Sequence, residues 1–243
     1  MEQYLIYDIE TVALPWESFS ESQQEYILRN AETEAEKEKK LSEMALSPLT
    51  SQIVCLGLQM MQSNEAGNYE FINRVAYSNK NQNNNEETEQ IKLSTGDDCY
   101  ICSEKKIIES FWKIFKKYPN IHLITFNGRN FDAPYIMLRS ALLAIKPTRN
   151  LMAGTKFSYP LHTDLADQLS FFSGSFYGAT KRFNFDFYTR AFGITSPKSE
   201  GIDGSKVAEF FHNNRYTEIA EYCLRDVVAT WELFLKWKEF LYF

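Results

Sequence analysis

The sequence predicts a single α/β domain that spans residues 1–243. Two observations support this fold class: strand-like segments lead the chain while helix-like segments follow, and no internal repeat is present. Apolar residues make up 44% of the chain, which is enough to form a sizeable core. We therefore expect one globular unit rather than a repeat array or a disordered protein.

Three strands are expected in the first half of the chain, because β-rich segments occur at residues 3–10, 52–60 and 69–77. Two polar segments interrupt this pattern. Residues 20–47 are charged and contain no glycine, which predicts a helical insertion. Residues 79–98 are rich in Asn, Gln and Glu, a composition typical of a mobile loop.

Helical patterns dominate the second half. Ser103 precedes a run with apolar residues at helical spacing, so we expect it to cap a helix over 104–117. Asn127-Gly128 is a strong turn signal after a short buried strand. The remaining elements are expected to be that strand at 121–126, a helix at 132–145, a strand at 161–169, helices at 182–192 and 204–213, and one long helix at 215–240.

The net charge of −6 argues against the wide basic surface of a typical nucleic-acid binder. Two segments account for this excess. Residues 20–47 hold seven acids and four bases, and residues 80–98 hold five acids and two bases. The remainder is neutral, so a nucleic-acid substrate would be gripped locally, at the end of a strand.

The sequence favours a cytoplasmic protein. It contains no run of about 18 apolar residues, and its first residues resemble a strand rather than a signal peptide. Cys99 and Cys102 form one C-x-x-C pair, without the second pair that a structural zinc site needs. The four cysteines are therefore expected to be reduced thiols.

The first candidate site is Asp8-Ile9-Glu10, at the end of the first strand. Side chains alternate along a strand, so Asp8 and Glu10 point to one face with Cα atoms about 6.6 Å apart. Two carboxylates among apolar neighbours repel each other and lose hydration unless a divalent cation lies between them. A strand that simply ends in solvent at Asp8 is the alternative.

Two more carboxylates occupy comparable positions. Asp132 lies where a strand turns into a helix, the place where α/β sheets carry their chemistry, and it is also suited to cap that helix. Asp226 falls within the apolar stripe of the last helix, with Tyr222 one turn earlier on the same face. A buried carboxylate at this position needs a cation, a basic side chain or the Tyr222 hydroxyl as its partner.

Carboxylates that converge from several elements have a known chemical use. Two divalent ions about 3.5–4 Å apart can clamp a phosphodiester, one activating the attacking water and the other stabilising the leaving 3′-oxygen. Oxygen ligands favour Mg²⁺ or Mn²⁺ over zinc. The expected metal ligands are Asp8, Glu10, Asp132 and Asp226.

The order of these motifs resembles the DEDD superfamily of 3′–5′ exonucleases, which has an RNase H-like fold with a mixed central β-sheet flanked by helices. D-I-E-T, F-N-G-x-x-F-D-x-P-Y and Y-x-x-x-D are similar to the proofreading exonuclease domain of family-B DNA polymerases. They look more closely like stand-alone bacterial proteins related to that domain, which residues 196–207 also resemble. The resemblance spans residues 3 to about 235, outside the two acidic insertions.

The resemblance implies roles for five residues. Asp8 would bridge both metals, and Asp132 would hold the second one. Glu10 would hold the nucleophile-side metal and contact the terminal 3′-hydroxyl, Asp226 would complete that metal site, and Tyr222 would orient the attacking water. A histidine-type member would carry His at position 221, which is Glu, so the chain resembles the tyrosine type.

Other residues are candidates for substrate contact. The resemblance implies that Asn127 and Phe131 contact the terminal nucleotide, and Thr11 is a further candidate for substrate binding. Lys181 and Arg182, together with two later lysines, are expected to contact phosphates. Those later lysines are Lys198 and Lys206.

Residues 171–188 contain eight aromatics. Unpaired bases can stack on such rings, but the helical spacing of several of them favours packing into the core for most. Asp164 and Asp167 form a D-x-x-D pair that we expect to be structural, outside the metal site.

The sequence therefore predicts a metal-dependent 3′–5′ exonuclease that acts on single-stranded nucleic acid, with DNA favoured. An RNA-trimming enzyme with the same site is one alternative, because the motifs do not report on the 2′-hydroxyl. A catalytically inactive module that binds nucleic acid or protein is the other, although an unused cluster of buried acids would cost stability. Proofreading for a polymerase would require an additional protein partner.

Overall fold

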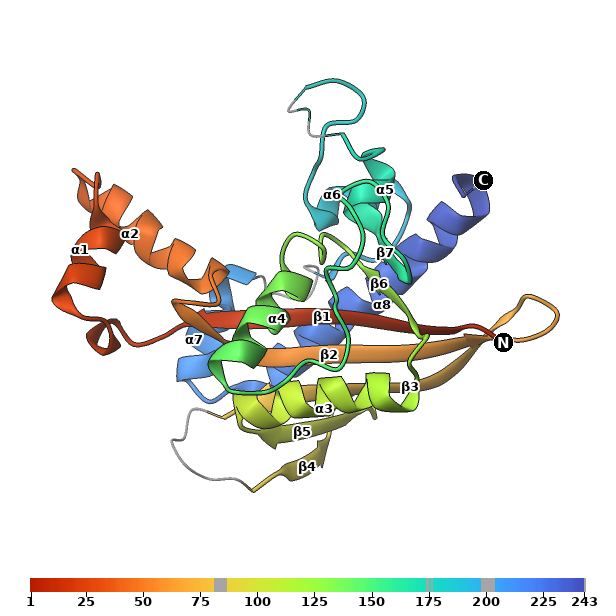
Figure 1. The fold of residues 1–243 in the computed structure, drawn as a ribbon, viewed down its shortest axis with the longest axis horizontal. Helices are drawn as coiled ribbons and strands as arrows, with labels where there is room; N and C mark the ends of the chain where they lie inside the picture. The colour runs from red at the N-terminus through yellow and green to blue at the C-terminus, as the bar shows by residue number, and fades with distance from the viewer. Residues whose placement is uncertain (81–86, 174, 176, 198–203, 243) are drawn as a thin grey trace.

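A seven-stranded sheet forms the centre of the computed structural model, which describes residues 1–80, 87–173, 175, 177–197 and 204–242 (Figure 1). The strand order is β4-β5-β3-β2-β1-β6-β7. Parallel and antiparallel pairs both occur, since β1 pairs antiparallel with β2 and parallel with β6. The strands are β1 (Gln3–Ala13), β2 (Ser51–Ser63), β3 (Tyr69–Asn79), β4 (Glu89–Lys92), β5 (Asp98–Cys102), β6 (His122–Thr125) and β7 (His162–Asp164).

Helices cover both faces of this sheet. Figure 1 shows α3 in front of it and α8 behind it. The helices and helical turns are η1 (Trp16–Ser18), α1 (Glu21–Leu28), α2 (Glu34–Glu43), η2 (Met44–Leu46), α3 (Glu104–Lys117), α4 (Asp132–Leu142), α5 (Leu165–Leu169), α6 (Phe185–Ala191), η4 (Gly204–Lys206), α7 (Val207–His212) and α8 (Tyr216–Phe240). Within the described residues, none of these helices combines the length and apolar character that crossing a membrane requires.

Side chains of β1 alternate between the two faces and so divide the core. Leu5, Tyr7 and Ile9 pack with α3 and α4 on one face. Tyr4 and Ile6 pack with α8 on the other. Because the period of a strand is two residues, the next positions on the α8 face are the acids of the first motif.

Local sequence signals explain why α3 and α8 form. The Ser103 hydroxyl accepts the Lys106 N–H at 3.3 Å and so caps α3, as the sequence predicted. Apolar residues at helical spacing turn one side of α3 toward the sheet. α8 contains 25 residues and is therefore about 37 Å long, enough to cross the sheet. The long C-terminal helix predicted from the sequence is confirmed.

The predicted helical insertion over residues 20–47 is confirmed as the pair α1 and α2, followed by η2. Figure 1 shows α1 and α2 standing beyond one end of the sheet. The insertion is tied back where it returns to β2. The Arg139 guanidinium donates to the Pro48 carbonyl at 3.1 Å and forms a buried ion pair with Glu104, and the Glu104 carboxylate accepts the Ile53 N–H at 2.8 Å.

Two sequence expectations for the connecting segments are wrong in part. Residues 89–92, expected in a mobile loop, form the edge strand β4 beside β5, and residues 81–86 of that segment lie outside the described residues. The strand expected at 161–169 ends at Asp164. The Asp164 carboxylate accepts the Ala166 N–H at 3.0 Å and caps α5, so the chain turns into a helix there.

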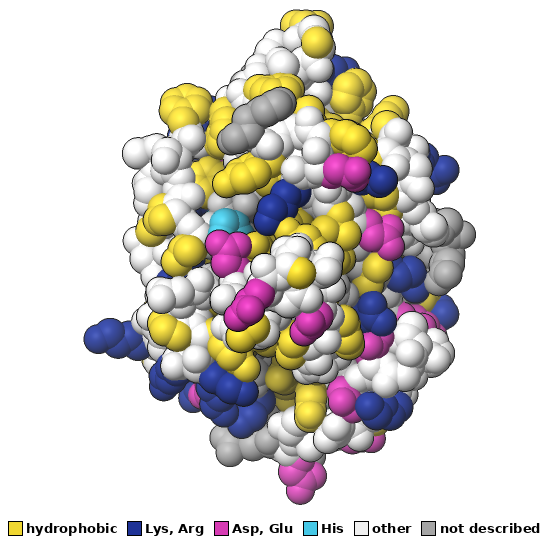
Figure 2. Space-filling model, turned by 90° about the vertical axis from the view of Figure 1, so that its right-hand side faces the viewer, with side chains coloured by type: hydrophobic (Ala, Val, Ile, Leu, Met, Phe, Trp, Pro, Cys, Tyr) yellow, Lys and Arg dark blue, Asp and Glu magenta, His cyan; other side chains and the backbone are white. Residues whose placement is uncertain are grey.

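The described aromatic residues of 171–188 do not pack mainly into the core, contrary to the sequence expectation. Phe171, Tyr177, Phe183 and Phe187 are exposed, and the exposed fraction of Tyr177 reaches 85%. The rings of Phe183 and Phe187 pack on each other, with centroids 5.0 Å apart, rather than on the sheet. Figure 2 shows hydrophobic side chains exposed over the upper part of its face, with acidic and basic side chains interspersed below.

Candidate active site

Asp8 and Glu10 lie on the α8 face of β1, as the alternation of strand side chains predicted. Asp8 pairs with Gly57 of β2 and Glu10 pairs with Cys55. The register then shifts by one residue, because Thr11 pairs with Ile53. Such a bulge twists the strand locally and redirects the side chains beside it. The Asp8 and Glu10 side chains therefore lie on the same face of β1, at the end of its regular pairing with β2.

Gly57 allows α8 to approach the sheet beside Asp8. A Cβ atom at position 57 would lie 2.9 Å from the Cys223 Sγ atom and 3.1 Å from a Val227 methyl group. Both distances are shorter than ordinary contacts, so only glycine leaves room for this turn of α8. The close approach brings Tyr222 and Asp226 of α8 to the acids of β1. A glycine inside a strand, directly opposite the first motif, was the sequence signal for this contact.

Asp132 is tied directly to the first motif. It is the first residue of α4, and its buried carboxylate accepts the Ile9 N–H at 3.0 Å. The N-cap position belongs to Phe131, so the interpretation of Asp132 as the helix cap is wrong. The Asp132 carboxylate instead turns toward the backbone between Asp8 and Glu10.

The turn that leads to Asp132 has a constrained backbone. Asn127 has a φ of 64°, in the left-handed region. A Cβ atom at Gly128 would lie 2.5 Å from the Thr125 side chain, so this position requires glycine. The Asp164 carboxylate accepts the N–H groups of Asn127 and Arg129, each at 2.7 Å. Asp164 is thus structural, as expected, and it fixes the turn.

One cavity of about 240 Å³ unites the candidate residues. Its walls come from β1, the turn before α4, α6 and α8. Seven of the residues singled out from the sequence line it, together with four neighbours. The lining residues are Asp8, Ile9, Glu10, Phe126, Asn127, Phe131, Asp132, Phe185, Tyr222, Asp226 and Thr230.

Burial and mutual repulsion dominate the electrostatics of this acidic cavity. Burial raises the pKa of Asp8 well above its usual range, and the charges of Asp132 and Asp226 raise it further. The pKa of Glu10 is raised for the same reasons. Burial raises the pKa of Asp132 to about 7, although the Ile9 N–H opposes the shift. Without added positive charge, several of these acids are held protonated near neutral pH.

Tyr222 is buried beside these acids. Burial, the nearby carboxylates and a hydrogen bond to Asp226 raise the pKa of its phenol, so the hydroxyl stays protonated. A protonated phenol can donate one hydrogen bond and accept others. The Tyr222 hydroxyl is therefore able to orient a water molecule.

The donor set fits hard divalent cations. Ligand atoms of Asp8, Glu10 and Cys223 all lie within 4.8 Å of one another. The Cys223 thiol donates to the Asp8 carbonyl oxygen at 3.4 Å, and burial raises its pKa, so it is a neutral donor rather than a thiolate ligand. Carboxylate oxygens remain as ligands, and oxygen ligands suit Mg²⁺ or Mn²⁺ better than zinc.

Four described sequence candidates lie outside the acidic cavity: Thr11, Lys181, Arg182 and Lys206, the last of which ends η4. The Thr11 hydroxyl donates to the Ala45 carbonyl at 2.7 Å and anchors the end of the insertion. Lys181 and Arg182 line a separate, larger cavity, and Arg182 forms an ion pair with Asp167. Arg182 also donates to the Asn127 side-chain oxygen at 3.2 Å, so it reaches the turn before α4. Lys198 lies outside the described residues.

Comparison with known proteins places the chain in a family. Residues 68–241 match the model of a family described as predicted 3′–5′ exonucleases related to the exonuclease domain of PolB. The chain belongs to this family. The matched segment contains Asp132, Tyr222 and Asp226, whereas β1 with Asp8 and Glu10 precedes it.

Two polymerases extend the comparison. DNA polymerase 1 of Sulfolobus acidocaldarius is 31% identical over 137 residues, which cover 54% of this chain and 15% of the polymerase. The family B DNA polymerase of the hyperthermophilic archaeon Pyrobaculum calidifontis matches the fold, with a TM-score of 0.56 and 18% identity over 100% of this chain and 25% of that chain. The chain thus spans a minor part of either polymerase. The fold match confirms the RNase H-like fold that the sequence predicted.

Proposed function

We propose that the protein is a 3′–5′ exonuclease that removes nucleotides from the 3′ end of a single strand, with DNA favoured over RNA. One observation carries this proposal. Four carboxylates and one tyrosine from β1, α4 and α8 line a single cavity. Membership of a family of predicted 3′–5′ exonucleases supports the same activity. The whole of residues 1–243 would form one exonuclease domain that carries the acidic insertions.

The proposed ligands for two Mg²⁺ or Mn²⁺ ions are Asp8, Glu10, Asp132 and Asp226. When bound, the cations would neutralise the carboxylates, promote deprotonation of water and stabilise charge on the leaving 3′-oxygen. The raised pKa values of three of these acids support this role, because the cluster needs positive charge in order to ionise.

Side chains of the protein would position the attacking water and the substrate. Tyr222 would use its protonated hydroxyl to hold water for attack on the terminal phosphodiester, with Asp226 fixing the phenol. Glu10 would accept a hydrogen bond from the terminal 3′-hydroxyl. Asn127 and Phe131, which line the cavity, would contact the last nucleotide.

Degradation of a 5′-labelled single strand tests this proposal directly. Wild-type protein with Mg²⁺ or Mn²⁺ should shorten the strand from its 3′ end, and EDTA or the Asp8→Ala substitution should stop the reaction. A matching RNA strand shows which sugar is preferred. If neither strand is shortened with either metal, the exonuclease proposal is wrong and a binding role for the cavity takes its place.

A further inference from the structure

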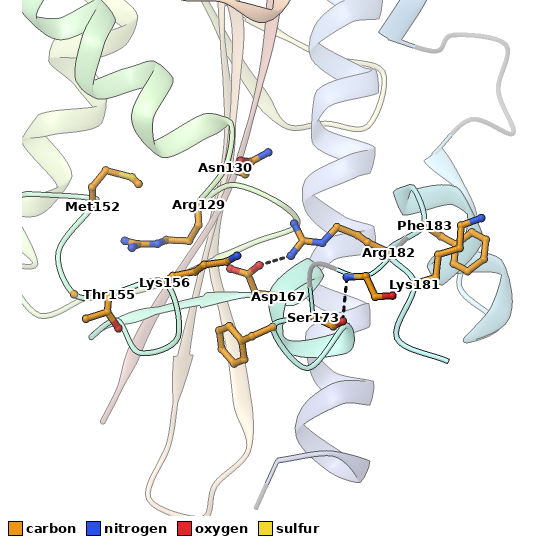
Figure 3. A pocket seen from close by; sticks show the side chains of 13 residues that line it. Arg129, Asn130, Met152, Thr155, Lys156, Asp167, Ser173, Lys181, Arg182 and Phe183 are labelled. Carbon is orange, nitrogen blue, oxygen red and sulfur yellow. Dashed lines mark hydrogen bonds and ion pairs between the residues drawn. The ribbon is translucent and has the colours of Figure 1, made fainter. Parts of the chain in front are cut away.

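A second and larger cavity adjoins the acidic one. It has a volume of about 890 Å³ and lies among the turn before α4, the loop of residues 151–158 and, from the following segment, residues 172, 173, 175 and 181–183. Four cationic side chains line it: Arg129, Lys156, Lys181 and Arg182. Figure 3 shows Arg129 and Lys156 on one side of this basic cavity and Lys181 on the other.

The first wall of the basic cavity is a tight, hydrogen-bonded turn at residues 154–158. Gly154 has a φ of +92°, and a Cβ atom there would lie 2.6 Å from the Ser158 carbonyl oxygen. The Thr155 N–H donates to that carbonyl at 2.7 Å, which closes the turn that presents Lys156. Arg129 then donates to the Ala153 carbonyl at 3.1 Å and joins this wall to the turn before α4.

The second wall is joined to the same turn. Arg182 forms its ion pair with Asp167 and donates to the side chain of Asn127, a residue that lines the acidic cavity. Figure 3 shows this Arg182–Asp167 contact across the middle of the basic cavity. A molecule held between these walls would therefore continue toward the acidic cavity.

Positive charge in the basic cavity is not neutralised by the described residues. Asp167 is the one acid among the described lining residues, and Arg182 already pairs with it. Arg129 donates to backbone carbonyls, and Lys156 and Lys181 form no ion pair with a described carboxylate. Such uncompensated cations attract phosphate groups, in a chain whose net charge is −6.

Aromatic rings accompany these cations. Phe172 and Phe183 line the basic cavity, and Phe183 is 41% exposed. The ammonium group of Lys181 lies 4.9 Å from the centre of the Phe183 ring. Cations beside exposed rings are the combination that binds a single strand, because phosphates meet the charges and bases stack on the rings.

We propose that the basic cavity holds the phosphodiester backbone of the nucleotides immediately 5′ of the terminal one. This inference rests on the proposed exonuclease function, since it assigns the upstream part of the same substrate. Lys156 and Lys181 grip the phosphates from opposite walls, while Arg129 and Arg182 hold the walls against the turn before α4. The protein therefore selects oligonucleotides over single nucleotides.

Binding of a labelled single strand of about ten nucleotides tests the assignment. The Lys156→Ala/Lys181→Ala double variant is compared with Lys113→Ala/Lys116→Ala, which removes the same charge from exposed positions on α3. Both are measured by fluorescence anisotropy in the Asp8→Asn background, so that the strand is not cleaved. We expect the first pair to weaken binding roughly tenfold at low salt and to reduce the slope of log affinity against log salt by about 1.4. Equal affinities and slopes for the two pairs would overturn the proposal.

A single-nucleotide substrate separates this proposal from the exonuclease proposal. In the p-nitrophenyl ester of thymidine 5′-phosphate, water attacks phosphorus and p-nitrophenolate leaves in place of the upstream nucleotide. With Asp8 intact, the Lys156→Ala/Lys181→Ala variant should hydrolyse this ester at the wild-type rate and degrade the oligonucleotide more slowly. Equal losses on both substrates would overturn the assignment. If wild-type protein hydrolyses neither substrate while the binding loss persists, the exonuclease proposal fails and the strand-binding cavity stands.

Matching DNA and RNA strands identify the chemistry that is recognised. The phosphodiester backbone is common to both, so the lysine substitutions should weaken both strands by the same factor. A loss confined to one sugar would contradict recognition of the phosphates.

Discussion

The acidic and basic cavities differ in charge and in construction. The acidic one is formed by β1, α4 and α8, whose backbones are fixed by the sheet and by a helix that spans it. The basic one is formed by loops, closed by local turns and by two arginines. The sheet and helices thus hold the acids in fixed positions, whereas the cations lie on loops. The proposed catalytic site and the proposed strand-binding site are separate cavities, but both are lined by residues of the Asn127–Asn130 turn.

The largest effect should come from an acid of the first cavity. Asp8→Asn removes one charge at the centre of the cluster and should lower kcat by about 10³-fold or more, because metal binding and transition-state stabilisation both depend on it. Binding of an oligonucleotide should remain, since the basic cavity is untouched. Parallel losses of strand affinity and of kcat would contradict the separation of the two cavities.

A smaller effect is expected from the tyrosine. Tyr222→Phe deletes one buried hydroxyl without leaving a large void, and it should lower kcat about 10²-fold while KM and the metal requirement stay near wild-type values. Steady-state kinetics on the labelled strand measure this, with circular dichroism as the check on folding. An unchanged kcat would remove Tyr222 from the proposed mechanism.

Substitution of Arg182, which lines the basic cavity and contacts Asn127 of the acidic cavity, should affect both kcat and KM. Arg182→Ala leaves Asp167 without its ion-pair partner and releases the Asn127 side chain, so we expect kcat and KM each to change by about tenfold. Arg182→Lys keeps the positive charge but loses the paired N–H donors of the guanidinium. Relative to Arg182→Ala, it should therefore restore KM more fully than kcat. A change in KM alone would reduce Arg182 to a simple phosphate contact.

The smallest expected effect is on stability. In the metal-free protein, burial raises the pKa of Asp132 from 3.8 to about 7, so between these values the folded chain holds a proton that the unfolded chain releases. Rising pH then favours unfolding over this window, and the melting temperature should fall by a few degrees between about pH 4 and pH 7. Asp132→Asn should remove the part of this dependence that Asp132 contributes, while the raised pKa values of Asp8 and Glu10 maintain the remainder, and Mg²⁺ should reduce it. A melting temperature that rises with pH would contradict the raised pKa.

Periodicity and capping explain which elements were predictable from the sequence. Ser103 and the apolar stripe after it indicated α3, and the uninterrupted stripe of residues 215–240 indicated α8. β4 was missed because its residues are polar. It is an edge strand that needs no apolar face, and its pairing with β5 depends on contacts that composition does not reveal.

The candidate site was predictable as a set of residue types but not as a set of contacts. Asp8, Asp132 and Asp226 stood out because each occupies a strand end or a core face. The hydrogen bond from Ile9 to Asp132 joins residues 123 positions apart, and no local pattern contains it. The helical spacing of Phe183 and Phe187 suggested core packing, but α6 begins only at Phe185, and Phe183 remains in the preceding loop.

The basic cavity was not predictable as a unit. The sequence singled out Lys181 and Arg182, whereas Arg129 and Lys156 gave no signal because they lie on separate loops. Gly154, with Thr155 and Ser158 after it, was the available indication of a built turn. Loops without periodicity bring these residues together only once the sheet has positioned their ends.

The contact between Cys223 and Asp8 joins residues 215 positions apart in the chain. Contacts of such high sequence separation carry a large loop-closure entropy cost, which slows folding. A ribosome-bound chain that has exposed β1 and α4 but not α8 holds three of its acids without the fourth acid or the tyrosine. The proposed active site is therefore complete only once α8 packs against β1.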